Sequence, residues 1–158
     1  MIVARRRWSR AGSGLLAVLA LAVLVGCRKP LPTITVYGSG HSIIVDAAAY
    51  RFAGGPNHQR ISDYGQAPTI TVEAGSPLLI DVPREVATNA WIVAAFTLDS
   101  AGTSKPLAGA GSAGALRDRH STRVSTSPAG VGTYYLQVVE LRGTEQAGGW
   151  VVHVRTTS

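Results

Sequence analysis

Short stretches in which apolar and polar residues alternate recur along the chain after residue 32. Thr33–Tyr37 and Thr69–Glu73 place apolar side chains at every second position, which is the period of a half-buried β-strand. Ala90–Leu98 is apolar on both faces, as in a central strand of a packed sheet. Helical periodicity is almost absent, so the pattern predicts an all-β domain.

Glycine and proline turns separate these stretches. Further strands are predicted at Ser42–Asp46, Leu78–Val82, Arg123–Ser125, Thr133–Leu141 and Trp150–Arg155. The turn Ala74–Pro77 between two predicted strands is typical of a β-hairpin. Seven or eight short strands joined by such turns predict an antiparallel, immunoglobulin-like β-sandwich.

Two aromatic positions fit that sandwich. Trp91 would fill the core between the sheets, and Tyr134 would form a tyrosine corner at the start of a late strand. Large aromatic residues also favour strands in general, so they indicate a sheet more directly than a strand order. The chain has one cysteine, so the disulfide of antibody-type domains is missing.

The N-terminal 26 residues have the layout of an export signal. Arginines within residues 5–10 precede an apolar run from Leu15 to Val25. This run is shorter than the roughly 20 apolar residues that a membrane-spanning helix needs. We therefore predict a signal peptide over residues 1–26 that is removed on export.

The sole cysteine follows this run directly. Leu24, Val25 and Gly26 precede Cys27 and resemble a bacterial lipobox, in which the cysteine thiol takes a diacylglycerol before cleavage after the glycine. An ordinary signal peptide without lipidation is the alternative. We predict that Cys27 is lipidated, that residues 27–32 form a Pro-rich tether, and that residues 33–158 form the β-sandwich domain.

Removal of the signal peptide changes the charge balance. The full chain has 15 Lys and Arg against 9 Asp and Glu, a net charge of +6. Four of these bases and none of the acids lie in residues 1–26, which leaves the mature chain at +2. A nucleic-acid interface needs bases clustered on the folded domain, so we expect no nucleic-acid partner. Arg28 and Lys29 adjoin the anchor, where anionic lipid headgroups would attract them.

Gly109–Gly114 matches the G-x-G-x-x-G pattern of dinucleotide-binding proteins. That fingerprint requires a buried strand before it, a helix after it and an acid about 20 residues further on, and none of these is predicted here. Ser112 lies near Asp118 and His120, but a nucleophile elbow needs a strand-to-helix turn in an α/β sheet. We interpret the segment as a flexible connection and expect no cofactor and no enzymatic activity.

The four histidines show no paired spacing of metal ligands. They are His41, His58, His120 and His153. Ligands can converge from distant segments, but surface imidazoles are the expectation, and we predict no metal site. With Cys27 acylated, a thiol redox centre and a Cys-ligated zinc or copper site are also excluded.

Four segments together resemble a family of uncharacterised actinobacterial lipoproteins with a domain of unknown function. They are the lipobox at Leu24–Cys27, the strand Ile34–Tyr37, the block Pro77–Trp91 and the late strand Tyr134–Val139. Abundant Ala, Gly and Val, with Arg used over Lys, fits a GC-rich genome. The resemblance implies an extracytoplasmic lipoprotein with a small β domain and brings no active residues to transfer.

We therefore predict an accessory or binding module of the cell envelope, held to the outer face of the cell membrane by diacylglycerol and acyl (palmitate) chains on Cys27. Its partner would be an envelope protein or lipid. The loops Gly54–Pro68 and Ser100–Arg119 are the first candidates for the contact, because exposed loops often carry function. The alternatives are a carrier of a small apolar or lipid ligand between the sheets and a hydrolase whose site only folding assembles.

Overall fold

Strands make up most of the computed structural model, which describes residues 29–53, 57–59, 64–112, 114–126 and 132–158. In this part the strands are β1 (Thr33–Gly38), β2 (His41–Asp46), β3 (Ala49–Arg51), β4 (Asn57–Gln59), β5 (Thr69–Glu73), β6 (Leu78–Asp81), β7 (Ala90–Leu98), β8 (Ser104–Gly111), β9 (Ser121–Val124), β10 (Thr133–Arg142) and β11 (Glu145–Thr157). A 3-10 turn, η1 (Tyr64–Gln66), and one helical turn, α2 (Arg84–Ala87), complete the described elements. The prediction of an all-β domain is confirmed.

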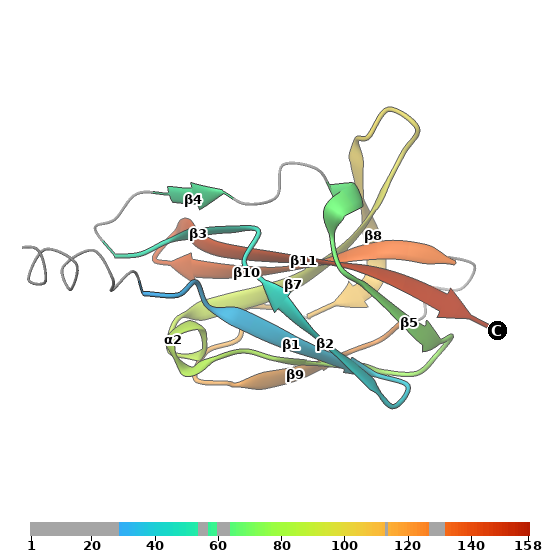
Figure 1. Ribbon diagram of the computed structural model, residues 1–158, viewed down its shortest axis with the longest axis horizontal. Coiled ribbons are helices and arrows are strands. Elements are labelled where there is room, and N and C mark those ends of the chain that lie inside the picture. The colour runs from blue at the N-terminus through green and yellow to red at the C-terminus, as the bar shows by residue number, and fades with distance from the viewer. Residues whose placement is uncertain (1–28, 54–56, 60–63, 113, 127–131) are drawn as a thin grey trace, which may run out of the picture. The chain divides into compact units, whose positions relative to one another are not determined.

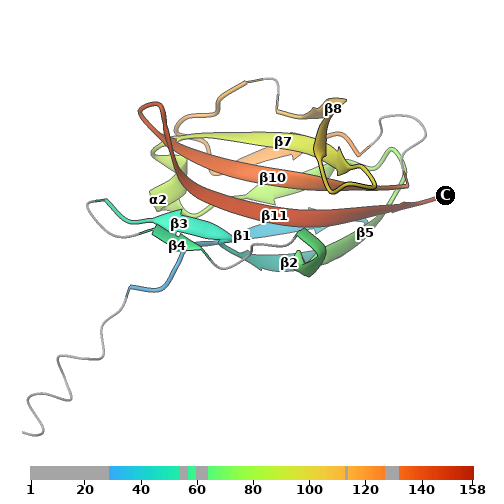
Figure 2. The ribbon, with the colours of Figure 1, turned by 90° about the horizontal axis from the view of Figure 1, so that it is seen from above.

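The strands form two sheets that lie face to face (Figures 1 and 2). Sheet A has the order β2-β1-β6-β9, and sheet B has the order β4-β3-β11-β10-β7-β8, with β5 beside the C-terminal half of β11. The β5–β11 pair is parallel and the other pairs of named strands are antiparallel. This arrangement is that of an antiparallel β-sandwich, while the immunoglobulin-like strand order stays a prediction.

The described strands outnumber the seven or eight that the sequence predicts. β3 and β4 are only three residues long and show no clear alternation. β8 lies within Ser100–Arg119, which the sequence predicts to be a loop, and its Gly, Pro, Lys and Ala residues are of types depleted in strands. It forms because β7 offers it a long partner, so tertiary pairing overrides local preference.

The predicted hairpin across Ala74–Pro77 is wrong. β5 pairs with β11 in sheet B, whereas β6 pairs with β1 and β9 in sheet A. The turn, with Gly75 at φ +85°, therefore carries the chain from one sheet to the other. Alternation within each strand is the same for a hairpin and for a connection between sheets, so the pattern could not distinguish them.

Two-residue hairpins do occur elsewhere. Ser39 and Gly40 join β1 to β2, with φ of 46° and 76°. Two consecutive positive φ values are typical of a type I′ turn, whose twist matches that of paired strands. Gly143, at φ 65°, and Thr144 join β10 to β11.

The core lies between the two sheets, and two tryptophans fill its centre. Trp91 on β7 and Trp150 on β11 are both fully buried, which confirms the core position predicted for Trp91. Each indole N–H also binds a main-chain carbonyl: Trp91 Nε1 donates to Arg119 O and Trp150 Nε1 donates to Pro32 O, both at 2.9 Å. The tryptophans thus fix two irregular segments, including the one that leads into β1.

Tyr134 is buried in the same core, but its hydroxyl differs from that of a tyrosine corner. Such a corner requires a hydrogen bond from the hydroxyl to the main chain. In the described part of the chain, Tyr134 Oη is buried without any hydrogen-bond partner. Burial raises the pKa of Tyr134 to about 12, because the phenolate would lose its hydration.

A substitution at Gly148 tests how tightly Trp150 is packed against its neighbours. A Cβ at this position would lie 2.8 Å from both Trp150 Cη2 and Tyr50 Cδ2. We expect Gly148→Ala to lower the free energy of unfolding by about 1–3 kcal/mol through overpacking, as measured by urea denaturation. Gly114→Ala is the matched control, because its added methyl would meet nothing within 4 Å. Equal stability of the two variants would contradict the described packing.

Tyr134 gives the fold an expected dependence on alkaline pH. Its folded pKa of about 12 exceeds the ordinary value of 10.0, so between these pH values the unfolded chain ionises first and stability falls. We expect Tyr134→Phe to be no less stable at pH 7 and to lose less stability at pH 11, measured by urea unfolding. Tyr37→Phe removes an exposed hydroxyl and serves as the control. If both variants showed the same dependence of stability on pH, the loss of stability at alkaline pH would not come from Tyr134.

Candidate functional site

The residues predicted for export and lipidation lie outside the described part of the chain. These are Leu24, Val25, Gly26 and Cys27. The signal peptide, the lipid anchor and the membrane localisation therefore stay predictions. Among the described residues, no helix has the length and apolar character that a membrane span requires.

The four histidines lie on separate elements. His41 begins β2, His58 lies in β4, His120 precedes β9 and His153 lies in β11. No group of three metal-ligating side chains occurs among the described residues. His153 packs on the outer face of sheet B, where its ring stacks on Tyr135 at 4.9 Å. Burial, and then the charge of Arg155, lower the pKa of His153.

The first three residues of the Gly109–Gly114 segment belong to β8, an edge strand of sheet B. Gly109 and Gly111 have φ of 81° and 103°, and a Cβ at Gly111 would lie 2.5 Å from Val93 O. Glycine at this position therefore lets β8 approach β7. The Ser112 hydroxyl accepts a hydrogen bond from Val93 N at 3.0 Å and donates one to Gly114 O at 2.8 Å. Its contacts hold the edge of the sheet.

A shallow groove of about 630 Å³ lies on the outer face of sheet A. It is lined by Tyr37, Gly38, Ser39, Gly40, His41, Ser42, Pro77, Leu79 and Arg123. The β1–β2 turn forms one wall of it. Because β1 runs the length of the sheet, this turn is at the opposite end of β1 from Thr33, where the domain begins (Figure 1).

Strand register explains why these side chains meet. Pairing aligns Ser42, Tyr37, Leu79 and Arg123 in one row across β2, β1, β6 and β9. In β1 the neighbours of Tyr37 are buried, so Tyr37 points away from the core. Residues opposite one another in a sheet project from the same face, which places all four side chains of the row on the outer face.

This face also carries the exposed apolar side chains of the domain. Tyr37 is 41% exposed and Ile44 is 72% exposed, and they are the large hydrophobic residues that the described part of the chain leaves exposed. Ile44 lies in the next row, where pairing sets it beside Thr35. A cluster of exposed apolar groups on a rigid sheet is typical of an interaction surface.

The groove has a positive character. Arg123 and His41 are among its lining residues and no acid is. Arg123 makes no ion pair with any residue that the structure describes. The acid of sheet A nearest to it on this face is Asp81, which lies in the adjacent row opposite Ser121. The guanidinium is thus available to an anion.

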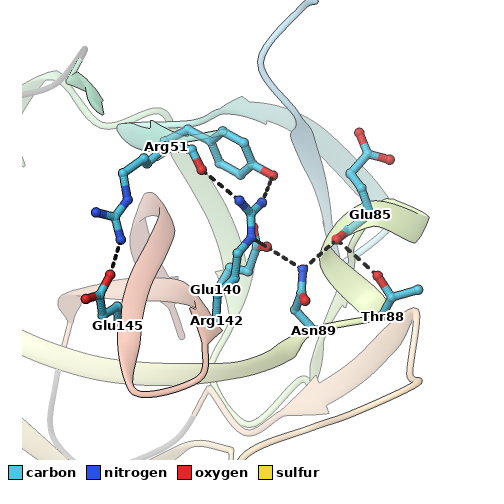
Figure 3. Close-up of polar contacts among 8 residues, drawn as sticks. Arg51, Glu85, Thr88, Asn89, Glu140, Arg142 and Glu145 are labelled. Carbon is cyan, nitrogen blue, oxygen red and sulfur yellow. Dashed lines mark hydrogen bonds and ion pairs between the residues drawn. The ribbon is translucent and has the colours of Figure 1, made fainter. Parts of the chain in front are cut away.

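A second polar cluster surrounds a buried glutamate (Figure 3). Glu140 on β10 is fully buried, and its Oε1 accepts hydrogen bonds from Asn89 Nδ2 at 2.7 Å and from Arg142 Nε at 3.0 Å. Arg142 also donates to Arg51 O at 3.0 Å and to Tyr50 Oη at 2.8 Å. These contacts join the β10–β11 hairpin to β3 and to Asn89, the second residue after α2.

The charged groups of this cluster interact with one another and thereby stabilise the fold. Burial and the negative charge of Glu140 raise the pKa of Tyr50, and the opposing charge of Arg142 lowers it. Tyr50 and Glu140 are themselves almost completely buried, so no ligand reaches them in this conformation. We therefore assign the cluster to stability and the groove to candidate function.

Sequence analysis missed both the groove and the buried cluster. The cluster had a signal: Glu140 falls in an apolar strand with Arg142 two positions later, and residues at i and i+2 share one face of a strand. Only part of the groove could be read from the sequence: the alternation in β1 places Tyr37 on the face opposite to Ile34 and Val36. Its alignment with Arg123 depends on two strand pairings that the pattern does not encode.

Comparison with family models, with curated proteins and with solved structures gave no match to this chain. The resemblance to actinobacterial lipoproteins therefore stays a prediction.

Two glutamates near the same hairpin distinguish buried from exposed ion pairs. Glu140→Ala would leave Arg142 without its buried partner, and we expect a loss of about 3–5 kcal/mol in the free energy of unfolding. Glu145→Ala removes an exposed pair with Arg51, and we expect a loss of at most about 1 kcal/mol. Urea denaturation measures both. Similar losses would show that the Glu140 pair is not structural.

Proposed function

We propose that this protein is a lipid-anchored binding module of the bacterial cell envelope, and that the outer face of sheet A contacts an anionic envelope component. The observation that carries the proposal is the coincidence of the exposed Tyr37 and Ile44 side chains with a groove that holds Arg123, which has no ion-pair partner among the described residues. Aromatic and arginine side chains are the residues that most often dominate binding energy at interfaces.

The geometry of the strands supports this face over the loops that the sequence suggested. Part of Ser100–Arg119 is the paired strand β8, and Gly54–Pro68 is only partly described. Side chains on paired strands are held in place before a ligand arrives, so less conformational entropy is lost on binding.

The interior of the sandwich gives less support to the alternative of a carrier. The space between the described strands is occupied by large side chains, among them Trp91, Trp150, Tyr134 and Leu136. The groove, in contrast, opens to solvent on the outer surface. A ligand held between the sheets would have to displace these side chains.

The predicted anchor would confine the groove near the membrane. Acyl chains contribute about 0.8 kcal/mol per buried methylene, and two or more chains give lasting attachment. Residues 28–32 span at most about 18 Å when fully extended, and β1 adds about 20 Å. The groove would thus stay within a few nanometres of the bilayer, where tethering raises its effective concentration toward envelope components.

In-cell photo-crosslinking tests the proposal. We would place p-benzoylphenylalanine at Ile44, on the proposed face, and at Thr71, an exposed residue of β5 in sheet B. We expect a single dominant adduct from position 44, its loss when Tyr37→Ala is added, and little from position 71.

The anchor is tested in the same cells with Cys27→Ser, in which we expect lipidation and the cleavage that follows it to be lost, while the domain stays folded. Labelling with an alkyne fatty acid should mark the parent chain but not this variant. Equal adducts from positions 44 and 71 would overturn the binding face, and a labelled Cys27→Ser variant would overturn the anchor.

A further inference from the structure

We infer that the groove beside Tyr37 binds an acidic saccharide, with the Arg123 guanidinium on a sugar carboxylate and the Tyr37 ring against the face of a sugar ring. The inference rests on the proposed function, because it names the ligand class of the same face. Three properties of the groove lead to this inference. They are the positive charge of Arg123, the exposed ring of Tyr37, and the main chain of β1 and β6, whose hydrogen-bonding groups are already used in strand pairing.

The charge favours a carboxylate. The planar guanidinium of arginine presents parallel N–H donors that match the two oxygens of a carboxylate. Arg123 has no such partner among the described residues, and no acid lines the groove that would repel the ligand. His41, the first residue of β2 after the β1–β2 turn, also lines the groove.

The aromatic ring favours a flat ligand with one apolar face. Tyr37 lies between Ser42 and Leu79 in its row, and its ring is partly open to solvent. A tyrosine ring combines an apolar surface with a polar hydroxyl. A sugar ring matches this, because its C–H groups form an apolar face and its hydroxyl groups lie around the edge. Ser42 is an exposed residue that lines the groove, and its hydroxyl group is of the kind that binds sugar hydroxyls.

The spacing fits a ring and its charged substituent. β6 separates β1 from β9, and neighbouring strands lie about 4.8 Å apart. Tyr37 and Arg123 are therefore two strand spacings apart, about 10 Å between main chains. Leu79 lies between them and forms an apolar floor.

The main chain beneath the groove disfavours a peptide. Extended peptides dock on sheets chiefly by hydrogen bonding to a free strand edge. β1 and β6, which provide Tyr37 and Leu79, are interior strands, each paired on both sides, so no strand edge is free beneath these two residues. The edges of sheet A are the outer sides of β2 and β9. Recognition there must use side chains, which suits a hydroxyl-rich sugar better than a peptide backbone.

Calorimetric titration of the full chain in detergent micelles tests the ligand class. The probes are an oligogalacturonate, its fully methyl-esterified form and a hexaglutamate peptide. We expect saturable binding of the oligogalacturonate and at least about tenfold weaker binding of the ester, because a charge-assisted hydrogen bond is lost. Hexaglutamate should not compete.

Variants locate the contact. Arg123→Gln and Tyr37→Ala should each weaken oligogalacturonate binding about tenfold or more, whereas Tyr37→Phe, which keeps the ring, should largely retain it. Arg155→Gln is the matched control, because Arg155 is an exposed arginine on β11 in sheet B. Urea denaturation of each variant confirms that it is folded.

The outcomes separate this inference from the proposed function. Absence of oligogalacturonate binding, or equal losses in Arg123→Gln and Arg155→Gln, overturns the saccharide site. Binding of hexaglutamate alone, lost in Arg123→Gln, assigns the groove to an acidic peptide and also overturns the ligand class. In either case a retained in-cell adduct at position 44 leaves the proposed binding face standing. Loss of that adduct overturns the face itself.

Discussion

The burial of Trp150 between the two sheets is the contact on which the rest of the domain depends. Trp150 lies near the middle of β11, which at 13 residues is the longest described strand and pairs with β10, β3 and β5. Full burial of one large apolar side chain contributes roughly 1.5–3 kcal/mol. Its indole N–H also binds Pro32 O, so one residue joins the centre of sheet B to the start of sheet A.

The same tryptophan constrains its neighbours. Tyr50 packs against it with ring centroids 6.0 Å apart, and Gly148 must lack a side chain so that both rings fit. The hydroxyl of Tyr50 then accepts a hydrogen bond from Arg142, which in turn binds the buried Glu140. The buried ion pair is thus a consequence of aromatic packing at this end of the sandwich. A buried pair seldom adds net stability over apolar residues, but this one holds the short strand β3 to the hairpin.

Properties of single strands could be predicted from the sequence, but properties of strand pairs could not. Alternation within Thr33–Tyr37 placed Ile34 and Val36 on one face of the strand, and this face is the buried one. Apolar continuity placed Trp91 in the centre. The partners of β5 and β6 were assigned wrongly, because local alternation carries no information about which sheet a strand joins. β8 was missed because its strand conformation comes from pairing with β7. The groove belongs to this second class, since Tyr37 and Arg123 are far apart in sequence and only meet through β6.

The groove is also coupled to the core below it. Gly38 follows Tyr37 directly, and a Cβ there would lie 2.5 Å from Val72 Cγ1 and 2.6 Å from Leu78 Cδ2. The main chain at the end of β1 is therefore pressed against core side chains of β5 and β6. Ser39 Oγ accepts a hydrogen bond from Glu73 N at 2.9 Å, which ties the turn to β5 as well. Because the end of β1 is held from below and from the side, the main chain at Tyr37 is fixed relative to β6 and β5. Close packing of the core thus maintains the shape of the outer face, and a ligand would meet a surface that is already arranged.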